Sequence, residues 1–300
     1  MIATFVIFLR EGIEASMIVA ILLAYLDRIG ERRHFRDVIA GVAAALVLVG
    51  AGGAAAYLTI RTYAGSRVQT IFETCTYLVA AAVLTYMTFW MRNHARNMSG
   101  ELRARTRAAL DSRARLGLGL LSFQAVGREG LETTVFTLAI VFASSGRGVI
   151  AGGVAGLVAS LAMAFVIYRM GRRINMGAFF TVVGALLMVF AAGILVDAVE
   201  GLQHLGWVTI LHDPMWSTAH VLSEDSTLGD IFHSFFGYSD RPTPLQLIVY
   251  VVYLACAVGA YLRIGRRSSS APPEASSSPD SPSPAPARHE VSATGPAPLP

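Results

Sequence analysis

The sequence predicts an all-α, polytopic membrane protein with seven transmembrane helices, arranged as two inverted three-helix repeats plus a seventh helix. Hydrophobic residues make up 54% of the 300-residue chain and charged residues only 15%, against about 25% charged residues in water-soluble domains. Seven apolar runs are long enough to cross a bilayer, which takes about 20 helical residues. A charged motif recurs in two of these runs, as expected for a repeat.

Arginine-rich or polar stretches separate the predicted spans and end each apolar run. We place the spans at about residues 2–26, 38–60, 70–91, 117–142, 149–169, 177–197 and 245–262. Together they form one permease domain over residues 1–265, with an outer loop at about 198–243. Residues 266–300 are mostly Pro, Ser and Ala, cannot bury enough apolar surface to fold, and are expected to form a disordered cytoplasmic tail.

Arginine placement predicts the orientation, because cytoplasmic loops retain positive charge. The loops after spans 1, 3, 5 and 7 hold 17 arginines, and the loops on the opposite side hold four. We therefore expect a multi-pass protein of a bacterial cytoplasmic membrane, with the amino terminus outside and the carboxyl terminus in the cytoplasm. The expected partners include the lipid bilayer and no nucleic acid.

Charged residues stand in the middle of the first and fourth predicted spans. The sequence reads R-E-G-I-E at residues 10–14 and R-E-G-L-E at residues 128–132. Each charge at bilayer depth costs on the order of 3 kcal/mol, so these side chains must face the bundle interior and have partners. Glutamates three positions apart share one helix face, so each motif presents two carboxylates to one point.

The two motifs run in opposite directions through the membrane, which fits inverted repeats with a site at the midplane. Glu11, Glu14, Glu129 and Glu132 then form a cage of carboxylates, and such oxygen ligands suit a hard, multivalent cation. Arg10 and Arg128 balance part of the charge of the empty site by pairing with glutamates. A structural ion-pair network that only joins spans 1 and 4 is the alternative.

The doubled R-E-G-x-E motif, with seven spans and an outside amino terminus, resembles the high-affinity iron permease family. The family signature is R-E-x-x-E, and Arg10, Glu11, Glu14, Arg128, Glu129 and Glu132 match it fully. The resemblance covers about residues 1–262 and includes D-A-V-E-G-L-Q-H-L-G-W at 197–207. It implies import of iron, as ferric ion delivered after oxidation by an extracytoplasmic oxidase or iron-donor protein. Iron is then the transported substrate, and no permanently bound cofactor is expected.

A second group of polar residues lies at the outer ends of predicted spans 3 and 6. Glu73 begins span 3, and Asp197, Glu200 and His204 follow helical spacing at the end of span 6. They are candidates for an outer vestibule that gathers cations. A helix-capping role for Glu73 and a solvated helix end for the others are the alternatives.

Three other functions remain open on the sequence alone. The first is transport of another hard or heavy cation, such as manganese or lead. The second is a membrane oxidoreductase with haem or a di-metal carboxylate centre, which is disfavoured because all seven histidines fall outside the predicted spans. The third is a scaffold whose acidic outer loop recruits a partner. We expect a transporter and not an enzyme.

Overall fold

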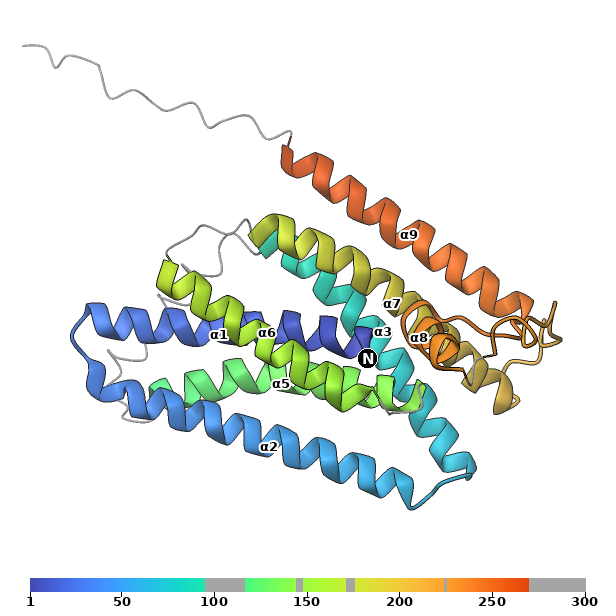
Figure 1. Ribbon diagram of the computed structural model, residues 1–300, viewed down its shortest axis with the longest axis horizontal. Coiled ribbons are helices and arrows are strands. Elements are labelled where there is room, and N and C mark those ends of the chain that lie inside the picture. Colours follow the sequence, from blue (N-terminus) through green and yellow to red (C-terminus); the bar gives the residue numbers. More distant parts are fainter. Residues whose placement is uncertain (95–116, 144–147, 171–175, 224–225, 270–300) are drawn as a thin grey trace, which may run out of the picture.

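The computed structural model describes residues 1–94, 117–143, 148–170, 176–223 and 226–269. Every regular element in these ranges is helical, which confirms the all-α prediction (Figure 1). The helices are α1 (Ile2–Arg28), the short 3-10 helix η1 (Arg32–His34), α2 (Phe35–Arg61), α3 (Arg67–His94), α5 (Gly117–Ala143), α6 (Val149–Met170), α7 (Met176–His204), α8 (Thr227–Phe236) and α9 (Pro244–Ser269).

Five helices in the described part of the chain are long and apolar enough to cross a membrane, namely α2, α3, α6, α7 and α9. Helices α1 and α5 are each 27 residues long, and their apolar stretches are interrupted by the three charged residues of each motif. Each predicted span lies within one long helix, although α7 extends past the expected end at residue 197 to His204. The chain is thus a multi-pass membrane protein built on helices.

The outward faces of the spanning helices are apolar. Val47 on α2 is 71% exposed and Ile150 on α6 is 79% exposed, and similar side chains continue along both helices. Contiguous apolar surface of this size is unfavourable in water. Contact with lipid explains why these side chains have no protein neighbours.

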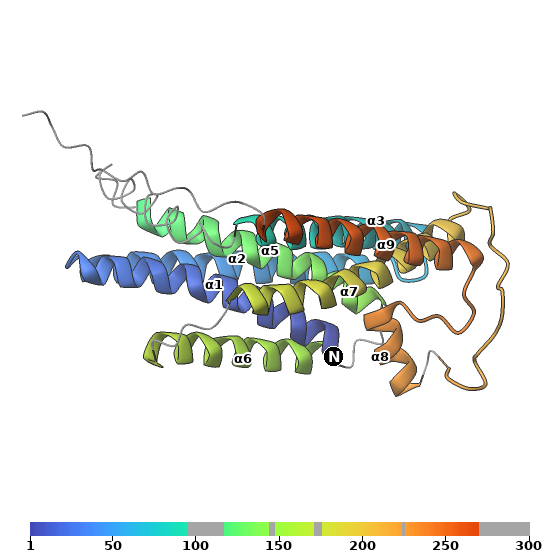
Figure 2. The ribbon, with the colours of Figure 1, turned by 90° about the horizontal axis from the view of Figure 1, so that it is seen from above.

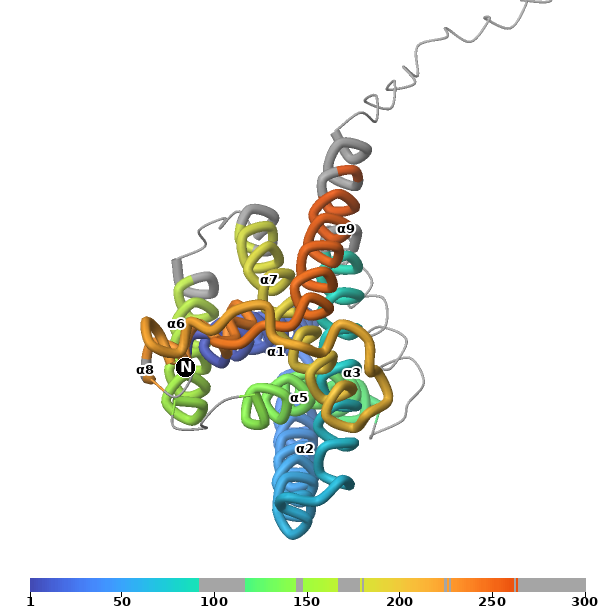
Figure 3. The backbone as a smooth tube through the Cα atoms, turned by 90° about the vertical axis from the view of Figure 1, so that its right-hand side faces the viewer, coloured from blue at the N-terminus to red at the C-terminus, as the bar shows by residue number. Residues whose placement is uncertain are grey.

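Helices α1 and α5 lie at the centre of the bundle. The most extensive packing joins α2 to α5, α1 to α6 and α3 to α7, and α1 also contacts α5 directly. Figure 3 shows α2 below and α6 to the left of this central pair, with α7 and α9 above it and α3 to its right. Gly152 and Gly156 allow the close contact of α6, because a Cβ atom at either would overlap the backbone of α1. Small residues at such positions are typical of closely packed membrane helices.

Three apolar clusters lie in the described part of the bundle, and two of them include residues of the central helices α1 and α5. The larger one includes Phe136, Ile140, Phe190 and Leu84, which join α5, α7 and α3. The smaller one lies at the end of the bundle where α1 finishes and α5 begins. Its buried members are Ile18, Leu22, Leu26, Val38 and Leu118.

The segment between α7 and α9 contains a helix that was not predicted. Ser226 caps the amino end of α8 by accepting a hydrogen bond from Gly229 N, and Gly237 ends it with φ 66°, a left-handed conformation that suits glycine. The Phe235 ring stacks on Phe190 of α7 at 6.4 Å between ring centroids. Helix α8 therefore packs on the end of the bundle where the amino terminus lies (Figure 2).

The carboxyl-terminal helix is longer than predicted. Because α9 continues to Ser269, it includes residues 266–269, which were assigned to the tail. Residues 270–300, the rest of the predicted tail, lie outside the described residues.

Candidate metal centre

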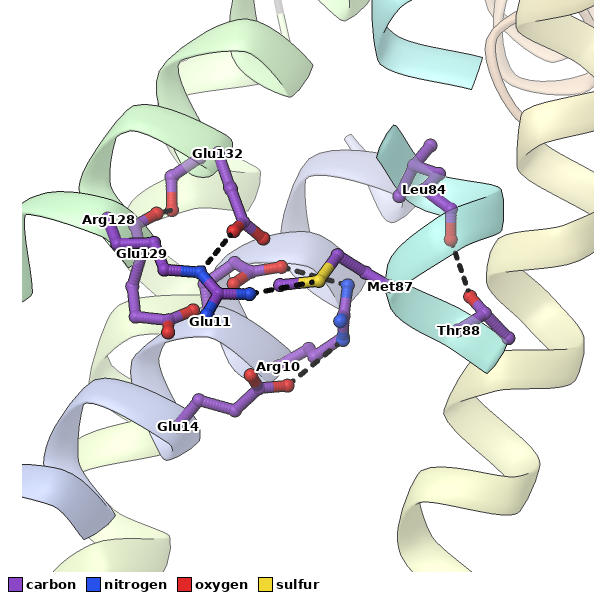
Figure 4. Close-up of polar contacts among 10 residues, drawn as sticks. Arg10, Glu11, Glu14, Leu84, Met87, Thr88, Arg128, Glu129 and Glu132 are labelled. Atoms are coloured by element: carbon purple, nitrogen blue, oxygen red, sulfur yellow. Dashed lines mark hydrogen bonds and ion pairs between the residues drawn. The ribbon is translucent and has the colours of Figure 1, made fainter. Parts of the chain in front are cut away.

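Three of the four predicted glutamates converge between the two central helices. Glu11 and Glu14 of α1 and Glu129 of α5 each offer a carboxylate oxygen, and these oxygens lie within 4.8 Å of one another. All three residues are buried, with exposed fractions of 3%, 3% and 7%. Figure 4 shows their side chains pointing toward one space from facing helices. We call these three residues the glutamate cluster.

Glu132 lies beside this cluster and is not part of the group of mutually close oxygens. Its Oε1 accepts a hydrogen bond from Arg128 Nε at 3.1 Å, and the side chain is 13% exposed. In place of the expected cage of up to four carboxylates, the structure has three clustered glutamates and one adjacent glutamate that is paired with arginine.

The two motif arginines have different surroundings. Arg10 is buried, with Nη1 3.0 Å from Glu11 Oε1 and Nε 3.1 Å from Glu14 Oε1. The Arg128 side chain is 48% exposed and forms an ion pair with Glu132. Both arginines thus pair with glutamates of their own motif, as predicted, but Arg10 pairs with two and Arg128 with one.

Several carboxylate oxygens at this centre are buried without a partner. Oε2 atoms of Glu11, Glu129 and Glu132 accept no hydrogen bond within the described part of the chain. A buried carboxylate oxygen without a partner is strongly unfavourable. A hard cation ligated by these oxygens would satisfy them, so the chemistry of the donor set fits a metal ion.

The glycines inside the motifs allow the surrounding helices to approach. A Cβ atom at Gly12 would overlap Ser160 of α6, and one at Gly130 would lie 3.2 Å from Val49 Cγ1 of α2. Each motif therefore has a neighbouring helix directly against its glycine. The structure thus supports a role in close helix approach for Gly12 and Gly130.

A cavity of about 590 Å³ adjoins the cluster. Helices α1, α2, α5 and α6 line it, and Glu11 and Glu129 form part of its wall. Most of the remaining wall is apolar, apart from Tyr57 and the threonine hydroxyls of α5. The cavity extends from the motifs toward the end of the bundle that holds the amino terminus. Its lining threonines are Thr133, Thr134 and Thr137.

The predicted vestibule residues lie apart from the cluster, near the ends of α3 and α7. Glu73 accepts a hydrogen bond from Gln69 at 2.7 Å, and Glu200 accepts one from Gln246 of α9 at 3.2 Å. His204 Nε2 lies 3.5 Å from Glu200 Oε1. These contacts show polar side chains engaged with neighbours, and the vestibule role stays a prediction.

Asp197, the fourth vestibule candidate, is 7% exposed. His233 Nε2 of α8 lies 3.8 Å from its Oδ1. The sequence gives no signal that joins these two residues, because they meet only through the packing of α8.

Two residues of α3 that the sequence analysis did not select also contact the centre. Arg128 Nη2 lies 3.3 Å from Met87 Sδ, and the Arg128 guanidinium lies over the Trp90 ring, 5.1 Å from its centroid. A methionine and a tryptophan near the end of an apolar helix are typical of packing and of a membrane interface. The sequence alone therefore gave no signal for this role.

Long apolar helices around a buried, partly neutralised carboxylate centre define the chain as a multi-pass membrane transport protein. The comparisons with known proteins narrow this class. The model of the Iron permease FTR1 family matches residues 1–267, and the chain belongs to this family. The resemblance predicted from the motifs is confirmed.

The curated relatives are named as permeases. A protein of Yersinia pestis named ferrous iron permease EfeU is 33% identical over 260 residues, covering 86% of this chain and 92% of the relative. One of the same name from Escherichia coli O6:K15:H31 is 31% identical over 268 residues, covering 87% and 95%. No solved structure shows a significant match. Family and relatives support iron transport, and the chain is a transporter rather than an enzyme.

Proposed function

We propose that this protein imports iron across the cytoplasmic membrane through the glutamate cluster between α1 and α5. The observation that carries the proposal is the convergence of three buried carboxylates from two helices, with oxygens within 4.8 Å of one another. A purely structural ion-pair network would pair every carboxylate with a cation. Here Glu129 has no ion pair within the described ranges, and its Oε2 has no hydrogen-bond partner there.

We also propose that the ion at the cluster is ferrous. When all are ionised, the four motif glutamates and two motif arginines leave a formal charge of −2, which a divalent ion neutralises. The relatives are named ferrous iron permeases. The ferric ion expected from the family resemblance would leave a net positive charge in a buried site, which is costly.

Repeat symmetry supports a seven-span topology in which α1 and α5 also cross the membrane. Ser16 donates a hydrogen bond to Gly12 O, and Thr134 donates one to Gly130 O. The same contact therefore occurs in both copies of the motif, 118 positions apart.

The neighbouring helices follow the same relation. Gly12 contacts Ser160 of α6 while Gly130 contacts Val49 of α2. Each half of the bundle thus packs its second helix on the motif helix of the other half. Such an exchange is expected for two three-helix repeats of inverted topology with a site at the midplane.

With the orientation set by the arginines, the cavity lies on the outer side of the cluster and serves as the path to it. The apolar residues Ile18, Leu22 and Leu26 lie on the cytoplasmic side and close the path there. Inward movement of a divalent ion through such a path gains about 5 kcal/mol per 100 mV of membrane potential.

The outer segment between α7 and α9 is the proposed docking place for an extracytoplasmic iron donor. Trp207, Ile210, Met215 and Val221 are exposed there, with Val221 78% exposed. Aromatic residues and methionine are enriched at protein interfaces. Acidic residues of the same segment would attract a basic partner or a cation.

Radio-iron uptake by an iron-starved host tests the proposal. The host carries the parent, Glu11→Gln or the matched control Glu31→Gln, which changes an exposed acid of the loop after α1. Iron is supplied as ferrous ion with a reductant or as ferric ion, each with and without excess manganese or lead. We expect uptake of ferrous iron by the parent and the control and its loss in Glu11→Gln. Retained uptake in that variant would remove the cluster as the path. Preferential uptake of manganese or lead would support the rival cation transporter.

A further inference from the structure

The two copies of the motif are alike in sequence but not in contacts. Positions 118 apart correspond, so Arg10 matches Arg128 and Glu11 matches Glu129. Arg10 pairs with both glutamates of its motif. Arg128 pairs with Glu132 and not with Glu129. The one contact missing from the second copy is therefore the pair between the arginine and the glutamate that follows it.

The missing contact is replaced by contacts to α3. Met87 Sδ lies 3.3 Å from Arg128 Nη2, and Met87 itself is 1% exposed, so its position is fixed by packing. The guanidinium also lies over the Trp90 ring at 5.1 Å from the centroid. A cation within about 6 Å of an indole face is attracted to it. Figure 4 shows Arg128 extending from α5 toward Met87.

Holding Arg128 toward α3 has a consequence for Glu129. If Arg128 paired with Glu129 as Arg10 pairs with Glu11, the guanidinium would occupy the oxygens that a cation needs. With Arg128 drawn toward α3, Glu129 keeps its carboxylate in the cluster, and its Oε2 has no hydrogen-bond partner within the described ranges. The fraction of molecules ready to bind an ion then depends on how firmly α3 holds Arg128.

We propose that Met87 and Trp90 form a seat for the Arg128 guanidinium that keeps Glu129 open for the transported ion. The inference rests on the proposed function of the cluster. Both residues act through Arg128 and do not touch the ion, so they are positioning residues. Their sulfur and indole groups hold the arginine without supplying a competing carboxylate.

The contact itself can be tested without iron. In the Trp207→Phe, Trp216→Phe protein, purified as the full chain in detergent, the remaining tryptophan of the sequence is Trp90. We expect Arg128→Gln to shift its emission spectrum, and the control Arg61→Gln, which removes the arginine beside Tyr57, to leave it unchanged. Identical spectra for parent and Arg128→Gln would overturn the seat while leaving iron transport by the cluster untouched.

The functional consequence is tested by a double-mutant cycle of ferrous uptake with Trp90→Leu and Arg128→Gln. We expect Trp90→Leu to raise KM by about 3- to 10-fold, the effect of losing one cation–π contact, with little change in maximal rate. Trp90→Phe keeps a ring and should restore most of the affinity. In the Arg128→Gln background, Trp90→Leu should add no further effect.

Two results would contradict the seat. One is an equal rise in KM from Trp90→Leu in the parent and in the Arg128→Gln background. The other is a fall in the maximal rate of uptake at unchanged KM. Ferrous binding to the purified variants in detergent replaces uptake if Arg128→Gln abolishes transport. Failure of the parent itself to take up iron would contradict the proposed function and not the seat, which the emission spectra test independently.

Discussion

Neutralising single glutamates separates a metal ligand from a structural ion pair. Glu129→Gln removes a carboxylate that has no ion pair within the described residues, and it keeps nearly the same shape. Glu14→Gln removes one that lies 3.1 Å from Arg10 Nε in a buried site. Both residues belong to the glutamate cluster, so a metal site predicts loss of transport from both. Only the Glu14 change disturbs an arginine.

The size of the two effects follows from the contacts. Removing one partner of a buried ion pair costs about 3–5 kcal/mol. Because Arg10 keeps its contact with Glu11, we expect the Glu14 variant to lose less than this, about 1–3 kcal/mol. Two ionised carboxylates 4.8 Å apart repel by about 3 kcal/mol at an effective dielectric constant near 20. Glu129→Gln should therefore leave the metal-free protein equally stable or make it more stable.

Thermal unfolding of the metal-free protein in detergent, combined with ferrous uptake in cells, measures both effects. We expect Glu14→Gln to lower Tm by several degrees, at about 2–4 °C per kcal/mol, while Glu129→Gln does not lower it. Uptake should be lost in both. If Glu129→Gln destabilised the protein as much as Glu14→Gln and still transported iron, the cluster would be a structural network and the ligand assignment would be wrong.

Three further perturbations test other parts of the structure. Because Glu132 is outside the cluster, Glu132→Gln should reduce iron uptake less than a substitution in the cluster does. An equal loss of uptake would instead support a site with four glutamate ligands. Gly12→Ala should destabilise the protein by about 1–3 kcal/mol through overpacking, because its Cβ atom would overlap the Ser160 side chain of α6. We therefore expect a lower Tm. A Cβ atom at Gly52 would meet open space, so Gly52→Ala should not lower Tm. An equal fall in Tm for the two variants would contradict the packing argument. Thr137→Trp should fill the cavity and block uptake, whereas Val47→Trp on the outer face of α2 should not; normal uptake with Thr137→Trp would exclude the cavity as the path.

The sequence could predict those parts of the fold and site that depend on local spacing. The apolar runs located each long helix, and the three-residue spacing within each motif placed two carboxylates on one face. Convergence of Glu11, Glu14 and Glu129 followed from the opposite directions of the two motif helices. The family followed from the doubled motif.

Other features could not be predicted, because they depend on contacts between distant segments. The different roles of Glu129 and Glu132 follow from Met87 and Trp90, which lie about 40 positions earlier on another helix. The cavity depends on which outer helix packs on which central helix. Helix α8 had a local signal, a serine cap and a left-handed glycine at its ends, but only ten residues between them.

The apolar residues on either side of the cluster explain how a site of this kind can hold an ion without leaking it. On α1, Ile18 and Leu22 lie one to two turns past Glu14 and are buried. Their counterparts 118 positions later, Phe136 and Ile140 of α5, are buried as well, so each direction along the bundle contains an apolar seal. Water and ions avoid such packed regions.

On the amino-terminal side, the cavity lies beside the apolar seal and gives access to the cluster. Thr133 and Thr137 of α5 line the cavity that reaches Glu129, whereas Phe136 and Ile140 beside them are not part of its wall. The wall of this cavity does not include Ile18 or Leu22. The cluster is therefore accessible from the amino-terminal end of α1 without separating packed helices, whereas passage toward the carboxyl-terminal end of α1 requires Ile18 and Leu22 to move away from Val38 and Leu118. With the orientation and repeat arrangement proposed above, this difference between the two ends of the bundle corresponds to an outward-accessible state of an inverted-repeat transporter.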